Sequence, residues 1–302
     1  MNVLICDGLD KEAIEQLQAA GHAVTVHRGI PKETLMELMP TCEAVVVRSA
    51  TKITKDVIER GARLKLIVRA GVGIDNVDAA TAEARGIAVR NTPAATSISV
   101  AEHTMALMLA LARHVTRANA SVKSGEWNRK AFEGTELYGK TLGVMGLGRI
   151  GAEVSKRARA FHMNVVAFDH IINMEVVNAL DIEALELDAL LQRSDYVTLH
   201  LPLVPETRHL INRERLALMK RGAYLINTAR GELIDEAAVA EAVRSGQLAG
   251  AAVDVYCGEP PAQDHPLVGL PQVITVPHLG GSTGEGQRRA GLEVARIICE
   301  FR

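Results

Sequence analysis

The chain has 302 residues, of which 48% are hydrophobic and 3% aromatic, so it is long enough for two domains with largely aliphatic cores. Its formal net charge of −2 gives no reason to expect a nucleic-acid or anionic-membrane partner. No apolar run approaches the ~20 residues of a membrane helix. The start, MNVLICDGLD, lacks the basic segment of a signal peptide. We therefore expect a cytoplasmic protein without a nucleic-acid or membrane partner.

The four cysteines are spread along the chain, at Cys6, Cys42, Cys257 and Cys299. They form no CxxC pair and no even ladder of spacings, so the sequence suggests neither a zinc site nor a disulfide framework. We expect buried, reduced thiols and no metal.

Residues 1–95 alternate short apolar runs with helical patterns. Strands are expected at 2–6, 22–27, 43–49, 64–71 and 87–92, and helices at 10–21, 31–39, 54–61 and 77–86. The first helix has an acidic start and ends at Gly21, and the second opens with Pro31, which are common signals of helix boundaries. This alternation predicts βαβ units around a mostly parallel sheet.

A single long helix is expected at 96–125, where a Ser/Thr-rich start precedes sustained helical patterning and a final glycine. The segment 126–140 is expected to be a loop that holds the only tryptophan, Trp127. A second alternating series follows, with strands at 140–146, 164–169, 195–202, 222–231, 248–255 and 272–278, and helices at 149–161, 187–194, 212–220, 235–246 and 284–302. The predicted fold class is therefore α/β with mostly parallel sheets.

Gly146, Gly148 and Gly151 match the pattern G-x-G-x-x-G. In a dinucleotide site the first glycine permits a tight turn, the second lets the backbone approach a pyrophosphate, and the third lets helix and strand pack closely. The pattern here follows an expected strand and opens an expected helix, whose N-terminal N–H groups would face the phosphates. It therefore predicts a dinucleotide cofactor.

Asp169 ends the next strand, close to the ~20-residue offset of a carboxylate that binds the adenosine ribose. A carboxylate accepts hydrogen bonds from a free 2′-hydroxyl and repels a 2′-phosphate, so Asp169 favours NAD over NADP. The alternative is an aspartate that only caps the turn after the strand.

Three polar residues lie at or just beyond the ends of predicted strands of the second series. Arg230 lies in NTARGELID, Glu259 in DVYCGEPP and His278 in VPHLGGST. Open α/β sheets bind ligands beyond the carboxyl ends of their strands, where all three residues fall. Taken singly, each has an ordinary alternative: a solvated loop charge, a turn residue, or a histidine without a catalytic role.

Together these side chains cover the roles that a nicotinamide cofactor needs to oxidise an alcohol, and no metal is required. Arg230 can bind a carboxylate through a bidentate fork. His278 can exchange a proton with a hydroxyl or carbonyl oxygen near neutral pH. Glu259 can orient the imidazole of His278.

Several segments resemble the D-2-hydroxyacid dehydrogenase family, in the same order and over nearly the whole chain. They are VVVRSATKIT, VRAGVGIDNVD, FEGTELYGKTLGVMGLGRIG, NTARGELID, AAVDVYCGEPP and VPHLGGST. Of these, RSATKIT and FEGTELYGKT resemble the phosphoglycerate dehydrogenases in particular. The resemblance implies a flavodoxin-like substrate domain at 1–95 with 283–302, a Rossmann NAD-binding domain at 96–282, and an active site in the cleft between them.

The resemblance also implies roles for individual residues. Arg230, Glu259 and His278 would be catalytic, and the backbone of Val72 and Gly73 would receive the substrate carboxylate. The NAD site would be formed by Gly146, Gly148, Arg149, Ile150, Gly151, Asp169, Thr228 and Asp254, of which Asp254 would contact the nicotinamide carboxamide.

A phosphorylated substrate needs several positive partners. Arg48 and Arg69 end predicted strands of the first domain and would bind the phosphate, and Arg129, in the loop after Trp127, is a further candidate. The alternative is that these arginines are ordinary surface charges. In similar enzymes this loop reaches the active site of a partner subunit, which implies a homodimer or a homotetramer.

The resemblance thus implies NAD-dependent oxidation of D-3-phosphoglycerate to 3-phosphohydroxypyruvate, the entry step of serine biosynthesis. The nearest alternative is a hydroxypyruvate or glyoxylate reductase of the same family. An alternative of another class is an NAD(H)-sensing binding protein, similar to the dehydrogenase-like corepressors, because fold does not fix function. Longer phosphoglycerate dehydrogenases carry C-terminal regulatory domains that these 302 residues lack, so serine feedback through such a domain is not expected.

Overall fold

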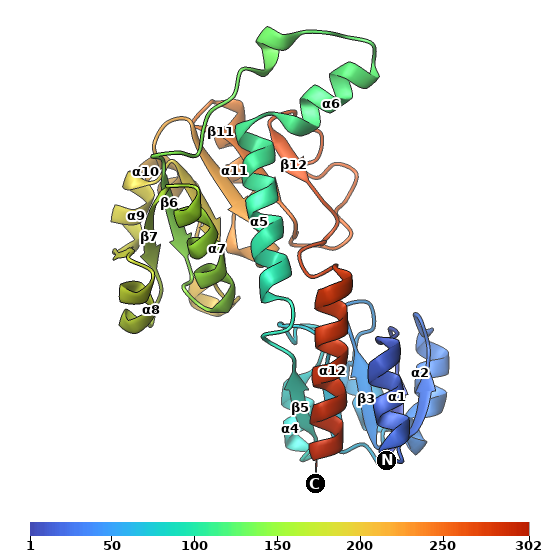
Figure 1. The fold of residues 1–302 in the computed structure, drawn as a ribbon. Coiled ribbons are helices and arrows are strands. Elements are labelled where there is room, and N and C mark those ends of the chain that lie inside the picture. The colour runs from blue at the N-terminus through green and yellow to red at the C-terminus, as the bar shows by residue number, and fades with distance from the viewer. Residues whose placement is uncertain (302) are drawn as a thin grey trace. The chain divides into compact units, whose positions relative to one another are not determined.

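A computed structural model describes residues 1–301, which form two compact units (Figure 1). The first unit comprises Met1–Ser97 and the chain from Gly281 onwards, and the second comprises Ile98–Gly280. Each unit has a parallel sheet with helices packed on both of its faces. The predicted fold class is therefore confirmed.

The sheet of the first unit has the strand order β2-β1-β3-β4-β5, and every neighbouring pair is parallel. Its strands are β1 (Asn2–Ile5), β2 (Ala23–Val26), β3 (Ala44–Val47), β4 (Leu66–Arg69) and β5 (Ala88–Asn91). This is the strand order of flavodoxin-like sheets, which bind ligands where the order reverses, at the carboxyl ends of the first and third strands.

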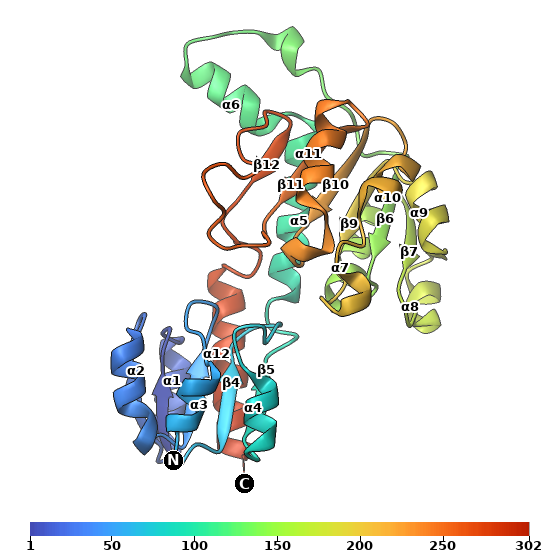
Figure 2. The same ribbon diagram turned by 180° about the vertical axis from the view of Figure 1, so that it is seen from behind.

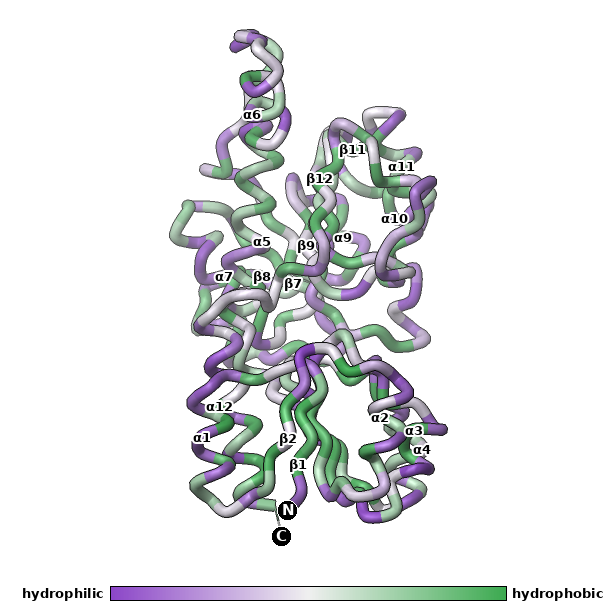
Figure 3. The backbone as a smooth tube through the Cα atoms, turned by 90° about the vertical axis from the view of Figure 1, so that its right-hand side faces the viewer, coloured by the Kyte–Doolittle hydropathy of each residue, from purple (hydrophilic) through white to green (hydrophobic). Residues whose placement is uncertain are grey.

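Helices cover both faces of this sheet. One face carries α2 (Lys32–Leu38), η1 (Met39–Thr41), α3 (Lys55–Arg60) and α4 (Ala79–Ala84), and the other carries α1 (Lys11–Ala19) and α12 (Gly284–Glu300). Hydrophobic residues dominate the strands, whereas the helices alternate in hydropathy (Figure 3). The helix predicted at 284–302 is observed from Gly284 to Glu300, and the final residue of that prediction lies outside the described residues.

The sheet of the second unit has the order β12-β11-β10-β9-β6-β7-β8, again with parallel neighbours. Its strands are β6 (Thr141–Met145), β7 (Asn164–Phe168), β8 (Glu183–Ala184), β9 (Tyr196–Leu199), β10 (Ala223–Asn227), β11 (Leu248–Val253) and β12 (Val273–Thr275). Counted from β6, this is the Rossmann order with one added strand, and the order reverses between β6 and β9. The sequence analysis missed β8 and the short helix α8 (Met174–Ala179) before it.

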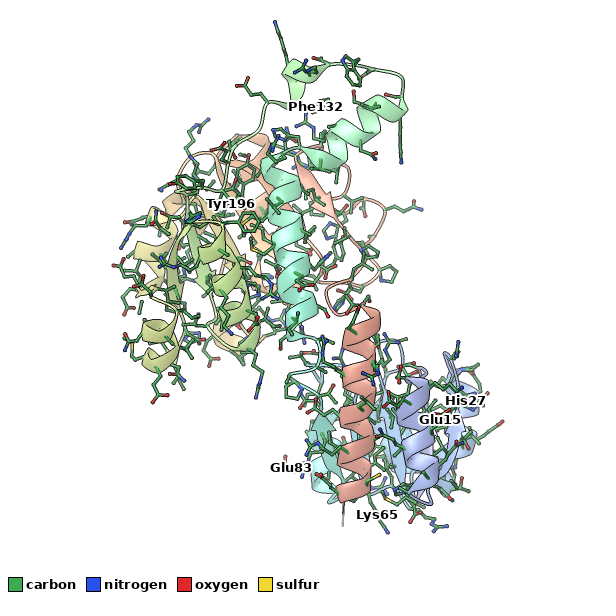
Figure 4. The ribbon with its side chains drawn as sticks, in the orientation of Figure 1. Glu15, His27, Lys65, Glu83, Phe132 and Tyr196 are labelled. Carbon is green, nitrogen blue, oxygen red and sulfur yellow. The ribbon has the colours of Figure 1, made fainter. Side chains whose placement is uncertain are left out.

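Helices also cover both faces of the second sheet (Figure 2). One face carries α5 (Ser97–Ala112) and α7 (Arg149–Ala160), and the other carries α9 (Leu187–Arg193), α10 (Arg213–Leu218) and α11 (Glu236–Arg244). Tyr196 of β9 is buried under α5 (Figure 4). Its ring stacks on Tyr224 of β10, with centroids 4.9 Å apart.

The prediction of one helix over 96–125 is wrong, because the structure has two helices there. α5 ends at Ala112, and α6 (Val115–Lys123) begins after His114, whose φ of 52° lies in the left-handed region. The N–H of Thr135 donates to the carbonyl of Ala112 at 2.9 Å. The loop before β6 thus donates to a carbonyl that, in a continuous helix, would accept a hydrogen bond from the N–H four residues later. The loop also contains a short 3₁₀ turn, η2 (Arg129–Phe132).

The expectation of buried cysteines is wrong for two of the four. Cys6 and Cys42 are buried in the first unit, whereas Cys257 and Cys299 are exposed. Cys257 lies in a turn after β11, and Cys299 lies in the last turn of α12, so neither belongs to a core strand. Across residues 1–301, no helix is both long enough and apolar enough to cross a membrane.

Candidate functional site

The glycine-rich turn joins β6 to α7 at the carboxyl end of the central strand. Gly146 has a φ of 97°, and a Cβ there would lie 2.6 Å from the carbonyl carbon of His200, just after β9. A Cβ on Gly151 would lie 2.0 Å from the oxygen of Gly146, whereas one on Gly148 would meet nothing within 4 Å. The protein's own packing therefore requires the first and third glycines, while the second faces open space, as the close approach of a pyrophosphate needs.

The start of α7 offers backbone donors beside this turn. Gly148 occupies the N-cap, and no described side chain caps the helix, so the N–H groups from Arg149 and Ile150 onward can bind an anion. Asp169, after β7, accepts a hydrogen bond from the N–H of Leu147 at 2.8 Å. That bond is made by Oδ2, and Oδ1 makes no hydrogen bond within the described residues. The turn-capping role of Asp169 is thus observed, and one carboxylate oxygen is left for a ribose hydroxyl.

Thr228, directly after β10, is 8% exposed, and its hydroxyl lies 3.0 Å from that of Thr104 on α5. Thr104 itself is fully buried and also donates to the carbonyl of Val100. The pair joins α5 to the carboxyl edge of the sheet. The sequence analysis named Thr228 but missed Thr104, because the two residues lie 124 positions apart.

Asp254, directly after β11, is only 1% exposed. Its Oδ1 accepts the N–H of Leu279 at 2.6 Å, and its Oδ2 accepts the N–H of Gly280 at 2.8 Å. His103 Nε2, on α5, lies 3.5 Å from Oδ1 but makes no aligned hydrogen bond. The buried carboxylate therefore holds the two residues that follow His278, a role that the sequence analysis did not assign to it.

The structure brings Glu259 and His278 into contact, with Glu259 Oε2 2.8 Å from His278 Nδ1. Nε2 is therefore the ring nitrogen left to exchange a proton with a ligand. The backbone of His278 has a φ of 52°, and its N–H donates to the carbonyl of Val276 at 3.1 Å. A non-glycine residue keeps such a conformation where its surroundings determine it, as the grip of Asp254 on the next two residues does here.

The carboxyl of Glu259 is subject to opposing effects. Burial raises its pKa, but the hydrogen bond and charge of His278, helped by the N–H of Tyr256 at 3.3 Å, outweigh burial and leave the pKa below its ordinary value. Glu259 is therefore ionised near neutral pH. An ionised carboxylate is the partner that stabilises an imidazole which gains and loses a proton.

Arg230 lies in the turn after β10, and that turn is held by Asn227. The Asn227 side chain is fully buried, donates to the carbonyl of Arg230 at 2.8 Å and accepts the N–H of Ala229 at 3.1 Å. The next residue, Gly231, packs on the turn after β11, because a Cβ on it would lie 2.0 Å from the carbonyl carbon of Tyr256. Arg230, Glu259 and His278 thus come from the adjacent strand ends of β10, β11 and β12. Asn227 was missed by the sequence analysis.

In the first unit, Arg48 and Arg69 lie at the carboxyl edge of the sheet. Arg69 ends β4 and pairs in register with Val47, so Arg48 is the next residue on the neighbouring strand. Asp7, just after β1, accepts the N–H of Arg48 at 2.7 Å. Arg48 therefore occupies the point where the strand order of this sheet reverses.

The side chain of Arg69 folds over the loop that follows β4. A Cβ on Gly71 would lie 1.6 Å from Arg69 Nη1, so the guanidinium touches the backbone of this glycine. Val72 and Gly73 follow directly, and the carbonyl of Val72 accepts a hydrogen bond from the side chain of Asn91. The structure thus brings Arg69 next to the backbone that was expected to receive a carboxylate.

Arg129 belongs to the second unit and lies in the loop that follows α6. It is exposed at the start of η2 and makes no hydrogen bond or ion pair with any of them among the described residues. Within residues 1–301, no three His, Cys, Asp or Glu side chains gather as a possible metal site.

Comparison with known proteins places this geometry in a known context. Residues 105–280 match the sequence model described as D-isomer specific 2-hydroxyacid dehydrogenase, NAD binding domain. The chain is 51% identical over 299 residues to the D-3-phosphoglycerate dehydrogenase of Methanocaldococcus jannaschii, covering 99% of this chain and 57% of that protein. It is 47% identical over 298 residues to the hydroxypyruvate reductase of Thermotoga maritima, covering 98% of this chain and 96% of that protein.

Among solved structures, D-lactate dehydrogenase from Aquifex aeolicus, complexed with NAD and lactic acid, matches with a TM-score of 0.85. The identity is 31%, and the match covers 98% of this chain and 94% of that one. The chain spans little more than half the length of the phosphoglycerate dehydrogenases it matches, 57% in the Methanocaldococcus jannaschii protein.

Proposed function

The chain belongs to the D-isomer specific 2-hydroxyacid dehydrogenases, and from this premise we propose that it oxidises D-3-phosphoglycerate to 3-phosphohydroxypyruvate with NAD. The observation that carries the proposal is the 2.8 Å contact between His278 and Glu259, on strand ends adjoining that of Arg230. The identity of 51% to a D-3-phosphoglycerate dehydrogenase supports the choice of substrate. By this proposal the reaction is the entry step of serine biosynthesis.

The mechanism follows from the three side chains. NAD, when bound, supplies the acceptor for the hydride that leaves C2 of the substrate. Arg230 binds the substrate carboxylate through its two-nitrogen fork and so orients C2. His278 Nε2 takes the proton of the C2 hydroxyl as general base, and the ionised Glu259 stabilises the imidazolium that results.

The residues present fit an NAD molecule. Gly148 leaves open space beside the donors of α7, where the pyrophosphate would bind, and Asp169 has an oxygen for the ribose. Thr228 and Asp254 lie at the ends of β10 and β11, where the nicotinamide would bind, with Asp254 at its carboxamide. We assign NAD binding to residues 96–282 and substrate binding to 1–95 with 283–302.

The first unit contributes the groups for the anionic ends of the substrate. Arg48 and Arg69 are the proposed phosphate partners, because both lie at the carboxyl edge of their sheet. The backbone of Val72 and Gly73, directly after the Gly71 that the guanidinium of Arg69 touches, is the proposed partner of the carboxylate. Arg129 is a further proposed phosphate partner and would act from a second copy of the chain.

A hydroxypyruvate reductase is the second candidate function. It is favoured by the relative from Thermotoga maritima, which matches over 96% of its own length. The chemistry at His278 would be the same, and only the phosphate partners would be unused. The role of Arg69 therefore distinguishes the two candidates.

Replacing Arg69 with alanine is expected to lower kcat/KM for 3-phosphohydroxypyruvate by roughly 10- to 100-fold, because a charge-assisted hydrogen bond is worth about 1.5–3 kcal/mol. The value for hydroxypyruvate should change less than about threefold. Arg63→Ala is the matched control, since Arg63 is exposed before the amino end of β4 and, among residues 1–301, forms an ion pair only with Glu43. Steady-state kinetics with both acids measures the effect. An unchanged value for the phosphorylated acid would remove Arg69 from the site and favour the reductase.

We also propose that α6 and η2 form an interface with a second copy of the chain. No residue of α6 is buried, and the apolar side chains of Val115, Val122 and Trp127 are 52%, 55% and 80% exposed. Phe132 of η2 (Figure 4) lies under the guanidinium of Arg117, with Arg117 Cζ 5.7 Å from the centroid of the Phe132 ring. Exposed valines on a helix without a buried residue, followed by an exposed tryptophan, are typical of a surface that becomes buried on association.

Trp127→Ala is expected to weaken the dimer by roughly 30-fold or more, as the loss of an interface hot spot does. Light scattering coupled to size exclusion, over a dilution series, measures the dissociation constant. Ile171→Ala is the control, because Ile171 is 91% exposed elsewhere in the same unit. A parent protein that stays monomeric at high concentration, or a Trp127 variant as dimeric as the parent, would contradict this interface.

A further inference from the structure

Glu236, in the first turn of α11, contacts the turn that carries Glu259. Its Oε1 accepts the N–H of Cys257 at 3.0 Å, and its Oε2 lies 3.0 Å from Nε2 of His265. The side chains of Glu236 and His265 are only 13% and 8% exposed. Glu236 and His265 thus form a nearly buried pair whose acid contacts Cys257, two residues before Glu259, and the mechanism above does not use it.

The ring of His265 faces Glu236 through Nε2. Its Nδ1 accepts the N–H of Leu267 at 3.3 Å, so in the neutral ring the proton is on Nε2, the nitrogen nearest Glu236. Nε2 makes no aligned hydrogen bond, and the 3.0 Å contact with Glu236 is therefore one of close packing. The ring also packs edge-on against Tyr256, with centroids 5.4 Å apart. His265 thus holds the oxygen of Glu236 that Cys257 does not use.

The segment that Glu236 holds is connected to both members of the catalytic pair. The N–H of Tyr256 donates to Glu259, and the hydroxyl of Tyr256 donates to the carbonyl of Val276 at 3.0 Å. That same carbonyl accepts the N–H of His278. A shift of the backbone at Tyr256 and Cys257 would therefore move Glu259 and the strand end of His278 together.

We propose that Glu236, fixed by His265, is a positioning residue for the His278–Glu259 pair and acts through the N–H of Cys257. Its kinetic readout rests on the proposed function, because it assumes that this pair handles the substrate proton. Glu236 supplies a hydrogen-bond acceptor that reaches the N–H of Cys257. By holding Cys257 in place, it keeps Glu259 within hydrogen-bonding distance of His278.

Cys257 reports on the same contact without any turnover. Burial first, and then the charge of Glu236 and a hydrogen bond to it, raise the pKa of the Cys257 thiol to about 12, although the residue as a whole is exposed. Because the thiolate is the form that alkylates, Cys257 should react slowly at pH 8. Cys299 is also exposed and serves as the internal reference. Removing the charge of Glu236 should speed the alkylation of Cys257 about tenfold or more.

Three variants separate reach from charge. Glu236→Gln keeps an acceptor at the same distance without the charge, Glu236→Asp keeps the charge but is one methylene shorter, and Glu236→Ala has neither. Glu214→Ala is the matched control, because Glu214 is an exposed acid in the first turn of α10 with no hydrogen bond or ion pair among the described residues. Turnover is measured with whichever of 3-phosphohydroxypyruvate and hydroxypyruvate the parent protein reduces faster. Alkylation by iodoacetamide is mapped by peptide mass spectrometry.

The proposal expects kcat to fall about tenfold in Glu236→Ala and Glu236→Asp, to stay within about threefold in Glu236→Gln, and to be unchanged in Glu214→Ala. The KM for the acid should change less than kcat. Alkylation of Cys257 should speed up in the Gln and Ala variants. The proposal is overturned if the Ala and Asp variants turn over as fast as the parent, or if the Gln variant falls as far as they do. Should Glu236→Ala not fold, the Asp and Gln variants give the same decision.

Failure of the proposed function gives a different result. A parent protein that turns over neither acid contradicts the proposed function alone. The alkylation rates then still test the contact between Glu236 and Cys257. In that case a Cys257 rate in the Gln variant equal to that of the parent overturns the proposal, and a raised rate supports it.

Discussion

His278→Ala is expected to lower kcat by roughly 10²–10⁴-fold, the usual cost of losing a general acid–base group. In the proposed mechanism Nε2 takes the hydroxyl proton, and Nδ1 is engaged by Glu259 at 2.8 Å. Neither of the other two side chains at these strand ends can replace it, because a guanidinium is not a useful proton acceptor and the pKa of Glu259 is held below its ordinary value. NADH binding, followed by fluorescence titration, should stay near that of the parent.

His162→Ala is the control for this variant. His162 is also exposed and also has a positive φ, of 58°, but it precedes the amino end of β7, away from the edge that carries the glycine turn. Its turnover should stay within about twofold of the parent. A His278→Ala enzyme that works within a few-fold of the parent would exclude His278 from the proton transfer.

Gly148→Ala and Gly151→Ala are expected to fail in different ways, although they place the same methyl group three residues apart. A Cβ at Gly148 meets no protein atom within 4 Å, so the variant should fold as stably as the parent. The methyl group would occupy the space proposed for the pyrophosphate. Overpacking of about 1–3 kcal/mol there should raise the Kd for NAD by roughly 5- to 150-fold.

In Gly151→Ala the added methyl group would lie 2.0 Å from the backbone oxygen of Gly146. Backbone cannot rotate away as a side chain can, so we expect a loss of about 3 kcal/mol of unfolding free energy. For a unit of this size that lowers Tm by roughly 6–12 °C. Calorimetry and NADH titration of both variants separate the effects. A Gly148→Ala protein with parental NAD affinity would place the pyrophosphate elsewhere.

Much of this fold is predictable because it rests on local patterns. The apolar runs and helix signals of residues 1–95 predict the alternating elements that are observed there. The strand, glycine turn and helix around Gly148 are also predicted, since the pattern lies within a few residues, and the packing of the turn itself requires its first and third glycines. The placement of Glu259 and His278 beyond neighbouring parallel strands was enough to expect them at one edge, and the structure brings them into contact.

Other features depend on contacts between residues that no local pattern connects. At the break near His114, the carbonyl of Ala112 accepts a hydrogen bond from the N–H of Thr135, which lies 23 positions later (135 − 112). The contact of Glu236 with Cys257 spans 21 positions, and the sequence analysis expected only a buried thiol at Cys257 and assigned no role to Glu236. Asn227 is only three residues from Arg230, whose turn it holds. Its burial, however, arises because β10 lies between β9 and β11 in the sheet, which no local pattern shows.

The measurement that tests the central claim most directly is NADH oxidation, followed by absorbance, with 3-phosphohydroxypyruvate and hydroxypyruvate at matched concentrations. The proposal predicts a kcat/KM at least about tenfold higher for the phosphorylated acid, from one or more charge-assisted contacts to the phosphate. Equal or reversed preference would contradict the phosphate site and favour a hydroxypyruvate reductase. No rate with either acid would contradict both and favour other 2-hydroxy acids or an NAD(H)-sensing protein.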